Sequence, residues 1–115
     1  GGYDTVNAKY KGSDITIYLR EGDDQSIATV FGILSNAPFF KTKDGIGVGT
    51  EKKKVIDIYA DYTKYIAPEY ETYPVRSKTK SCIAVMDTME SRALLFHIVD
   101  RKVSSVEISS YYEFY

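Results

Sequence analysis

The sequence predicts an α+β fold: an antiparallel β-sheet of about five or six strands that contains two hairpins, with one main α-helix packed on one face. A strand–turn–strand pattern occurs twice, at Ile15–Leu34 and at Leu94–Tyr112. Between the two copies, after the glycine-rich segment Asp44–Thr50, the hydrophobic spacing changes to that of a helix. A chain of 115 residues has the length of one domain, so we expect a single domain over residues 1–115.

The first part of the chain is predicted to form three strands. Tyr3–Tyr10 is the opening strand, and a turn follows at Lys11–Asp14. From Ile15 to Leu19 apolar and polar residues alternate, which is the period of a half-buried strand. The acidic turn Glu21–Asp24 then leads to a strand at Ile27–Leu34, which is rich in β-branched and aromatic residues.

One helix is predicted from Thr50 to about Tyr65. Apolar side chains recur there at the spacing i, i+3, i+4 and i+7, at Val55, Ile58, Tyr59 and Tyr62. Thr50 is expected to accept a hydrogen bond from a first-turn amide, and Glu51 suits the positive end of the helix dipole. Pro68 sets the limit of the helix.

The last part of the chain is predicted to contain the second hairpin. Glu69–Lys80 is irregular or an edge strand, because Pro74 disfavours a central strand. The next strand is Ser81–Asp87, and the hairpin strands that follow are Leu94–Val99 and Val103–Ile108.

The charge balance argues against nucleic acid as the main partner. Fifteen basic residues are distributed among sixteen acidic ones, the net charge is −1, and no face is expected to be basic. The single run, Lys52–Lys54, points three side chains in different directions on a helix, whereas phosphate binding requires converging cations.

No stretch approaches the ~18 apolar residues of a transmembrane segment.

The glycine-rich segment Gly45-x-Gly47-x-Gly49 precedes a helix, as phosphate-binding loops do. It lacks the G-x-G-x-x-G order after a buried strand and the lysine of a phosphate loop. We therefore predict a structural turn that directs Ile46 and Val48 into the core, and no nucleotide or other cofactor.

No catalytic or metal-binding constellation is visible. The single histidine, His97, alternates with apolar residues in a predicted strand and is interpreted as a structural or surface residue. The turn at Glu21–Asp24 lacks the ligand order of a calcium loop. The single cysteine, Cys82, excludes an internal disulfide, and its apolar neighbours predict a buried small side chain.

Tyrosine is the compositional anomaly, with eleven residues in the chain. Tyrosine provides rigid amphipathic contact area, which suits protein or carbohydrate surfaces, but it is also a common strand residue. One group lies at the C-terminus, at Tyr111, Tyr112 and Tyr115; the other is the candidate binding group, Tyr62, Tyr65, Tyr70 and Tyr73.

Two segments carry a resemblance to known families. Thr42–Thr50 followed by Val55–Tyr59, and the late hairpin Leu94–Val106, are similar to the SmpA/OmlA-type outer-membrane lipoprotein domain and to the β-lactamase-inhibitor-protein-like fold. The resemblance implies a non-catalytic bacterial module that works by binding protein. It also implies a location outside the cytoplasm: periplasmic, anchored at the outer membrane, or secreted. No functional residues transfer. The start at Gly1-Gly2-Tyr3 is interpreted as following a removed signal peptide or lipoprotein leader.

Three functional hypotheses follow from these observations. The first is a protein-binding or scaffolding module that uses the exposed sheet face and the segment Tyr65–Tyr73. The second is a small-ligand or carbohydrate-binding domain with tyrosines as stacking platforms, for which a concave pocket lined by two or more tyrosines would be the sign. The third is an enzyme, for which a histidine bonded to an acid in a cleft would be the sign.

Overall fold

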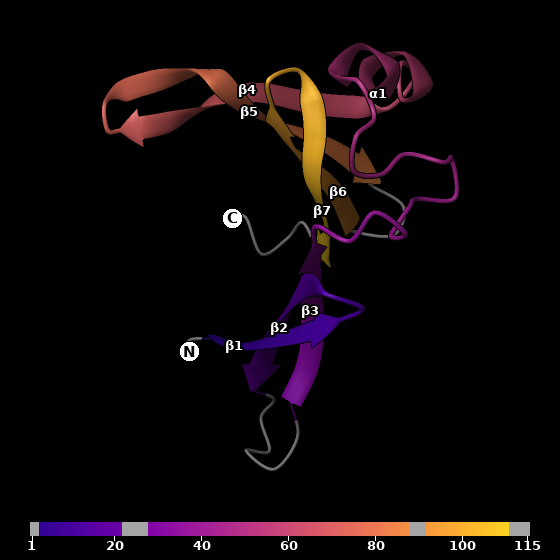
Figure 1. The fold of residues 1–115 in the computed structure, drawn as a ribbon, viewed down its shortest axis with the longest axis vertical. Helices are drawn as coiled ribbons and strands as arrows, with labels where there is room; N and C mark the ends of the chain where they lie inside the picture. Colours follow the sequence, from indigo (N-terminus) through magenta and orange to yellow (C-terminus); the bar gives the residue numbers. More distant parts are fainter. Residues whose placement is uncertain (1–2, 22–27, 88–91, 111–115) are drawn as a thin grey trace.

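The computed structural model describes residues 3–21, 28–87 and 92–110, and within them it contains one open antiparallel sheet and one short helix (Figure 1). The sheet has seven strands in the order β1-β2-β3-β7-β6-β5-β4. The α+β class is confirmed in this broad form, but the predicted number of five or six strands is wrong. In chain order the elements are β1 (Tyr3–Tyr10), β2 (Ser13–Glu21), β3 (Ala28–Ser35), α1 (Lys52–Ile58), β4 (Thr63–Thr72), β5 (Val75–Asp87), β6 (Arg92–Val99) and β7 (Lys102–Ser110).

The two predicted hairpins are present, and they meet in the middle of the sheet. β2 pairs with β3, β6 pairs with β7, and both pairs are antiparallel. β3 then pairs with β7, with Ser35 opposite Val106. The repeated strand–turn–strand pattern therefore marks two halves of one continuous sheet. Of the predicted acidic turn, Glu21 is the last residue of β2, and the rest lies outside the described residues, as do Tyr111, Tyr112 and Tyr115.

The additional strand is β4, which begins where the sequence predicted the end of the helix. The prediction of a helix to Tyr65 is wrong, because α1 ends at Ile58 after seven residues. The Lys64 ammonium donates to the carbonyl oxygens of Tyr59 at 2.8 Å, Ala60 at 3.1 Å and Tyr62 at 3.1 Å. These carbonyls follow the helix, so the lysine stabilises a turn that ends it.

The segment Glu69–Lys80, predicted to be irregular or an edge strand, forms the end of β4 and the start of β5. β4 is an edge strand of the sheet, where a proline is tolerated because one side of the strand needs no partner. The register between β4 and β5 shifts immediately after Pro68 and again between Tyr70 and Thr72. The long β4–β5 hairpin is consequently irregular towards its tip.

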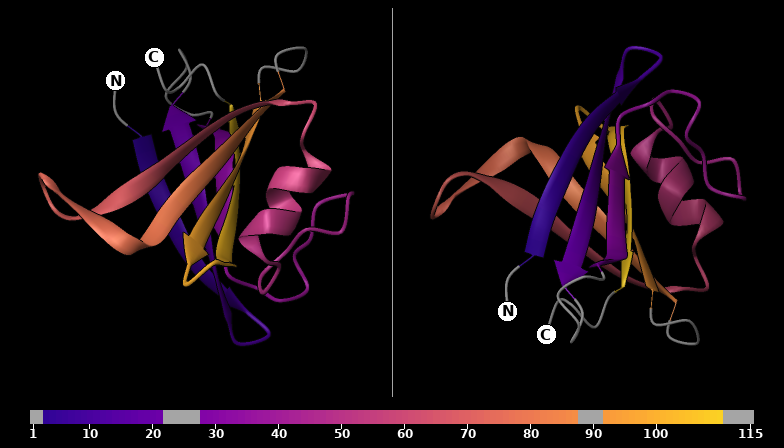
Figure 2. Two further views of the ribbon diagram at one scale, coloured as in Figure 1. Left: turned by 90° about the horizontal axis from the view of Figure 1, so that it is seen from above. Right: turned by 90° about the horizontal axis from the view of Figure 1, so that it is seen from below.

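The hydrophobic core lies between α1 and the face of β5, β6 and β7 that the helix covers (Figure 2). Val55 and Tyr59 are buried, and the Tyr59 ring stacks on Phe96 with centroids 5.7 Å apart. Ile58 and Tyr62, the other two members of the predicted apolar stripe, are exposed: Ile58 is the last helical residue, and Tyr62 lies beyond the end of the helix. The remaining buried core side chains are Ile46, Ile83, Val85, Ile98, Val103 and Val106.

The glycine-rich segment is a tight turn that inserts Ile46 into this core. Ile46 is fully buried, while Val48 is only partly buried. The predicted helix cap at Thr50 is wrong, since its hydroxyl accepts from the Gly47 amide at 3.2 Å and Glu51 occupies the cap position. All three glycine amides donate within the protein: Gly45 to the Thr42 carbonyl, Gly47 to Thr50 and Gly49 to the Val103 carbonyl.

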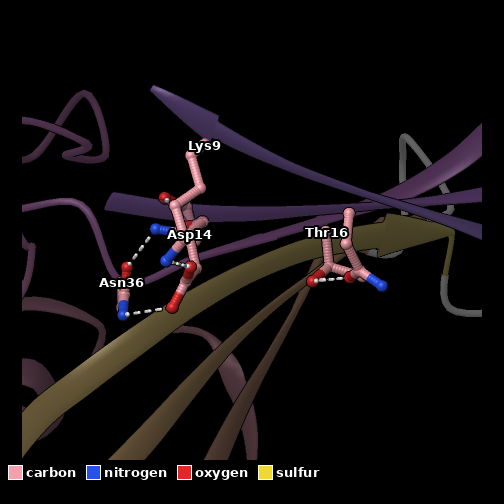
Figure 3. A network of polar contacts seen from close by, with 6 residues as sticks. Lys9, Asp14, Thr16 and Asn36 are labelled. Atoms are coloured by element: carbon pink, nitrogen blue, oxygen red, sulfur yellow. Dashed lines mark hydrogen bonds and ion pairs between the residues drawn. The ribbon is translucent and has the colours of Figure 1, made fainter. Parts of the chain in front are cut away.

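The β1–β2 hairpin extends the sheet beyond the part that the helix covers, and the residues from Asp4 to Tyr10 are all exposed. A polar network at its turn connects it to the end of β3 (Figure 3). Lys9 pairs with the Asp14 carboxylate and lowers its pKa. The Asp14 amide donates to Asn36 Oδ1 at 2.9 Å.

No helix among the described residues is long and apolar enough to cross a bilayer.

Candidate functional site

The most prominent surface feature is the end of the β4–β5 hairpin, which projects beyond the rest of the sheet (Figures 1 and 2). β6 pairs with β5 only from Lys80 onward, so among the described strands β4 alone pairs with the preceding part of β5. In this protruding ribbon Tyr70 lies opposite Arg76, and Thr72 lies opposite Val75. A cis peptide bond joins Tyr73 to Pro74 at the turn.

Two of the four candidate tyrosines meet at the tip of this hairpin. The rings of Tyr70 and Tyr73 have centroids 5.1 Å apart, and the Arg76 guanidinium lies 5.4 Å from the Tyr70 ring. Tyr73 is 79% exposed and Val75 is 58% exposed. We call Tyr70, Tyr73, Val75 and Arg76 the tip cluster.

The other two candidate tyrosines lie elsewhere. Tyr65 is 64% exposed on β4, opposite Ala84. Tyr62 follows α1 and packs edge-on against Tyr59, with centroids 5.5 Å apart. Val75 and Arg76 were not predicted as site residues. The turn Tyr73-Pro74 followed by an apolar and a basic residue is the sequence signal that could have indicated them.

The base of the projecting hairpin is anchored to the middle of the sheet by His97. His97 Nδ1 lies 3.2 Å from Glu69 Oε1, and Glu69 on β4 immediately precedes Tyr70. His97 Nε2 lies 3.7 Å from Glu107 Oε1 on β7, an ion-pair distance, and makes no hydrogen bond among the described residues. One imidazole on β6 therefore faces carboxylates from both flanks of the sheet.

These two carboxylates determine the protonation of the imidazole. Glu107 raises the pKa of His97 most strongly, burial opposes this rise, and Glu69 adds to it. The Glu107 side chain is 15% exposed and the Glu69 side chain is 38% exposed, so both carboxylates act in a partly buried environment that screens charge less than bulk water does.

Cys82 lies directly opposite His97 on the neighbouring strand β5. Burial raises the pKa of its thiol to about 11, and the carboxylates of Glu69 and Glu107 contribute to the rise. A thiol with this pKa is protonated at neutral pH and is a poor nucleophile. Among the described residues no group of three or more His, Cys, Asp and Glu side chains has the arrangement of a metal site.

A separate cleft of about 350 Å³ lies beside the end of α1 and is lined by two tyrosines, Tyr59 and Tyr62. Asp44 and Arg92 also line this cleft. Tyr59 is only 2% exposed, and its hydroxyl donates to Thr42 Oγ1 at 3.1 Å. Burial raises the pKa of Tyr59 to about 12. The ring of Tyr62 is therefore the main aromatic surface open to a ligand here.

Comparisons of this chain with protein-family models, with curated proteins and with solved structures give no match. The resemblance to envelope lipoprotein domains and inhibitor-like folds stays a prediction. Function is therefore inferred from the geometry of the tip cluster and of the clefts.

Proposed function

We propose that this chain is a non-catalytic protein-binding or scaffolding module of a bacterial envelope or secreted protein, and that the tip cluster is its contact surface. The observation that carries the proposal is the packing of Tyr70, Tyr73 and Arg76 at the exposed end of a projecting hairpin. The proposed location outside the cytoplasm, either secreted or lipid-anchored, is based on the sequence resemblance.

The chemistry of these side chains favours a protein partner. Tyrosine and arginine are, with tryptophan, the residue types enriched in interface hot spots, and tyrosine gives a large contact area at a small entropic cost. The Tyr70–Tyr73 contact and the Arg76 guanidinium restrict the cluster before it binds. Such preorganisation lowers the entropic cost of association.

Cys82 and His97 are the side chains with the greatest catalytic potential, and their surroundings favour a structural role for both. Cys82 is protonated at neutral pH, and both ring nitrogens of His97 face carboxylates, that of Glu69 on the hairpin and that of Glu107 on β7. The Glu69–His97 contact connects the strand that carries Tyr70 to the centre of the sheet. We infer that this pair holds the tip cluster in a fixed direction.

Quantitative capture from a bacterial envelope extract tests the proposal. The immobilised wild-type chain is compared with a variant carrying Tyr70→Ala and Tyr73→Ala. Loss of one interface hot spot costs about 2 kcal/mol or more, and hot-spot values are not additive, so we expect capture of a specific protein to fall by at least roughly thirtyfold in the double variant. The control variant carries Val6→Ala and Tyr10→Ala, which remove exposed apolar area from the opposite end of the sheet.

The variants must first show wild-type thermal unfolding, so that a loss of capture reports on the surface. Equal capture by the wild type and the Tyr70/Tyr73 variant would reject the tip cluster as the contact surface. Equal losses in the tip variant and in the Val6/Tyr10 control would indicate nonspecific adhesion.

The cleft beside Tyr62 supports a second candidate, a small-ligand or carbohydrate site. It combines an exposed tyrosine ring with charged groups from Asp44 and Arg92, which is the composition of a small polar-ligand site. A screen of soluble sugars by ligand-detected NMR tests it. Saturation transfer that disappears in Tyr62→Ala and persists in Tyr73→Ala supports this site, whereas no transfer in the wild type rejects it.

A further inference from the structure

Three basic segments that are distant in the sequence meet where β6 turns into β7. Two adjoining clefts, of about 500 and 620 Å³, share Lys52, Asp100 and Arg101 in their walls. The basic side chains that line them are Lys52, Lys53, Lys78, Lys80, Arg101 and Lys102. Glu51 and Asp100 are the carboxylates in the same walls, so the clefts carry an excess of four positive charges. The expectation that no face is basic is wrong at this end of the molecule.

Hydrogen bonds hold the backbone at the turn that carries Arg101 and at the start of α1. The turn at Asp100 and Arg101 has φ values of 50° and 69°, the positive pair that closes a two-residue hairpin. The Asp100 amide donates to the Thr79 carbonyl on β5 at 2.9 Å, and the Lys52 amide donates to the Arg101 carbonyl at 2.8 Å. In Figure 1 this turn lies between the β4–β5 hairpin and α1.

The strand that supplies the remaining lysines is also fixed. The Ser77 side chain is buried, and its hydroxyl accepts from the Thr79 amide at 3.2 Å and from the Lys80 amide at 2.9 Å. Lys78 lies inside this small loop of hydrogen bonds. Ile66, Pro68 and Ile98 line the first cleft beside the basic groups, so it has both apolar and cationic walls.

None of the six cations forms an ion pair with a carboxylate of the described residues. The ion pairs among the described residues join Lys9 to Asp14 and His97 to Glu69 and Glu107. Unpaired like charges in one region repel each other, and a bound anion removes that repulsion. Lysine and arginine together favour phosphate and sulfate groups, since arginine forms paired hydrogen bonds to their oxygens.

We propose that these two clefts form one binding site for a small, multiply charged phosphate or sulfate compound, whose anionic groups occupy both sides of the Asp100–Arg101 turn. Each cleft has the volume of a small-molecule site. The site uses none of the tip-cluster residues, so it is independent of the proposed protein-binding surface.

Isothermal titration calorimetry with sodium tripolyphosphate and with inorganic phosphate tests this site. We expect saturable binding of tripolyphosphate, weaker binding of phosphate by about tenfold or more, and affinity that falls as salt is added. A variant with Lys78→Gln and Arg101→Gln is expected to bind tripolyphosphate about tenfold more weakly or worse. The control, Lys9→Gln with Lys11→Gln, removes the same charge at the β1–β2 turn and is expected to keep wild-type affinity.

A second arm identifies the source of the phosphate. Cosedimentation with phosphatidylcholine vesicles that contain phosphatidylinositol bisphosphate measures binding to a lipid headgroup. Vesicle binding that depends on Lys78 and Arg101 would support the proposed site and would identify its ligand as a phosphate on a lipid headgroup. The absence of saturable binding in both arms overturns the proposal. Equal weakening in the Lys9/Lys11 control also overturns it, because binding would then follow net charge alone. Thermal unfolding without ligand verifies that each variant is folded.

Discussion

The contact between His97 and Glu69 leads to a quantitative prediction about how the projecting hairpin is anchored. The perturbation is a double-mutant cycle with Glu69→Gln, His97→Gln and the double variant. The Nδ1–Oε1 distance is 3.2 Å, and the side chains are 29% exposed for His97 and 38% for Glu69. Exposed ion pairs contribute about 0.2–1 kcal/mol and hydrogen bonds to charged groups about 1.5–3 kcal/mol. This pair, with about a third of each side chain exposed, should therefore couple by about 1 kcal/mol when the imidazole is charged.

The sign of the pH dependence follows from the direction of the pKa shift. The neighbouring carboxylates raise the pKa of His97 above the value of 6.5 that applies when the chain is unfolded. The stabilisation is therefore fully present below that value and is lost as pH rises through the higher pKa of the folded state. The coupling energy should be larger at about pH 6 than at about pH 9.

Urea unfolding monitored by circular dichroism at both pH values measures the coupling. Glu71→Gln is the matched control, because it removes a carboxylate two residues further along β4. A coupling energy that does not change between the two pH values would refute the charged anchor. A coupling near zero at both values would show that the contact does not hold the hairpin.

Two further substitutions test the core and the glycine-rich segment. In Gly47→Ala the new Cβ would lie 2.8 Å from Lys41 Cγ and 2.9 Å from the Phe40 carbonyl oxygen, and this backbone oxygen cannot move freely. We expect the free energy of unfolding to fall by about 1–3 kcal/mol. A fall below about 0.5 kcal/mol would show that the turn adapts. Tyr59→Phe removes the buried hydrogen bond to Thr42 and should lower the free energy of unfolding by about 1 kcal/mol in chemical denaturation, whereas an unchanged value would contradict the pairing of these hydroxyls.

Local patterns were sufficient to predict the two hairpins, whereas the helix starts at Lys52 and not at the predicted Thr50. The alternation at Ile15–Leu19 and the turn at Lys11–Asp14 both specify structure over a few residues, and β2 and its preceding turn form there. The helical spacing was real at Val55 and Tyr59 but was extended too far. The Lys64 ammonium ends the helical region through carbonyl contacts that residue spacing does not reveal.

The candidate sites were predictable only in part, because most of them are assembled across strands. Tyr70 and Tyr73 could be proposed from composition, and their contact is made within one hairpin. The contacts of His97 with Glu69 and Glu107 depend on the strand order and register of four strands. The basic clefts were hidden for the same reason, since a chain with a net charge of −1 gives no indication that its cations converge.

Site-specific photo-crosslinking tests the central claim, that the tip cluster contacts a protein, most directly. A photoreactive amino acid is placed at Val75 in the tip cluster or at Val6 on β1, two positions with similar exposure of 58% and 45%. After irradiation in envelope extract, we predict a discrete protein adduct from position 75, its loss when Tyr70 and Tyr73 are replaced by alanine, and no adduct from position 6. Absence of an adduct at position 75, or equal adducts from both positions, would contradict the claim.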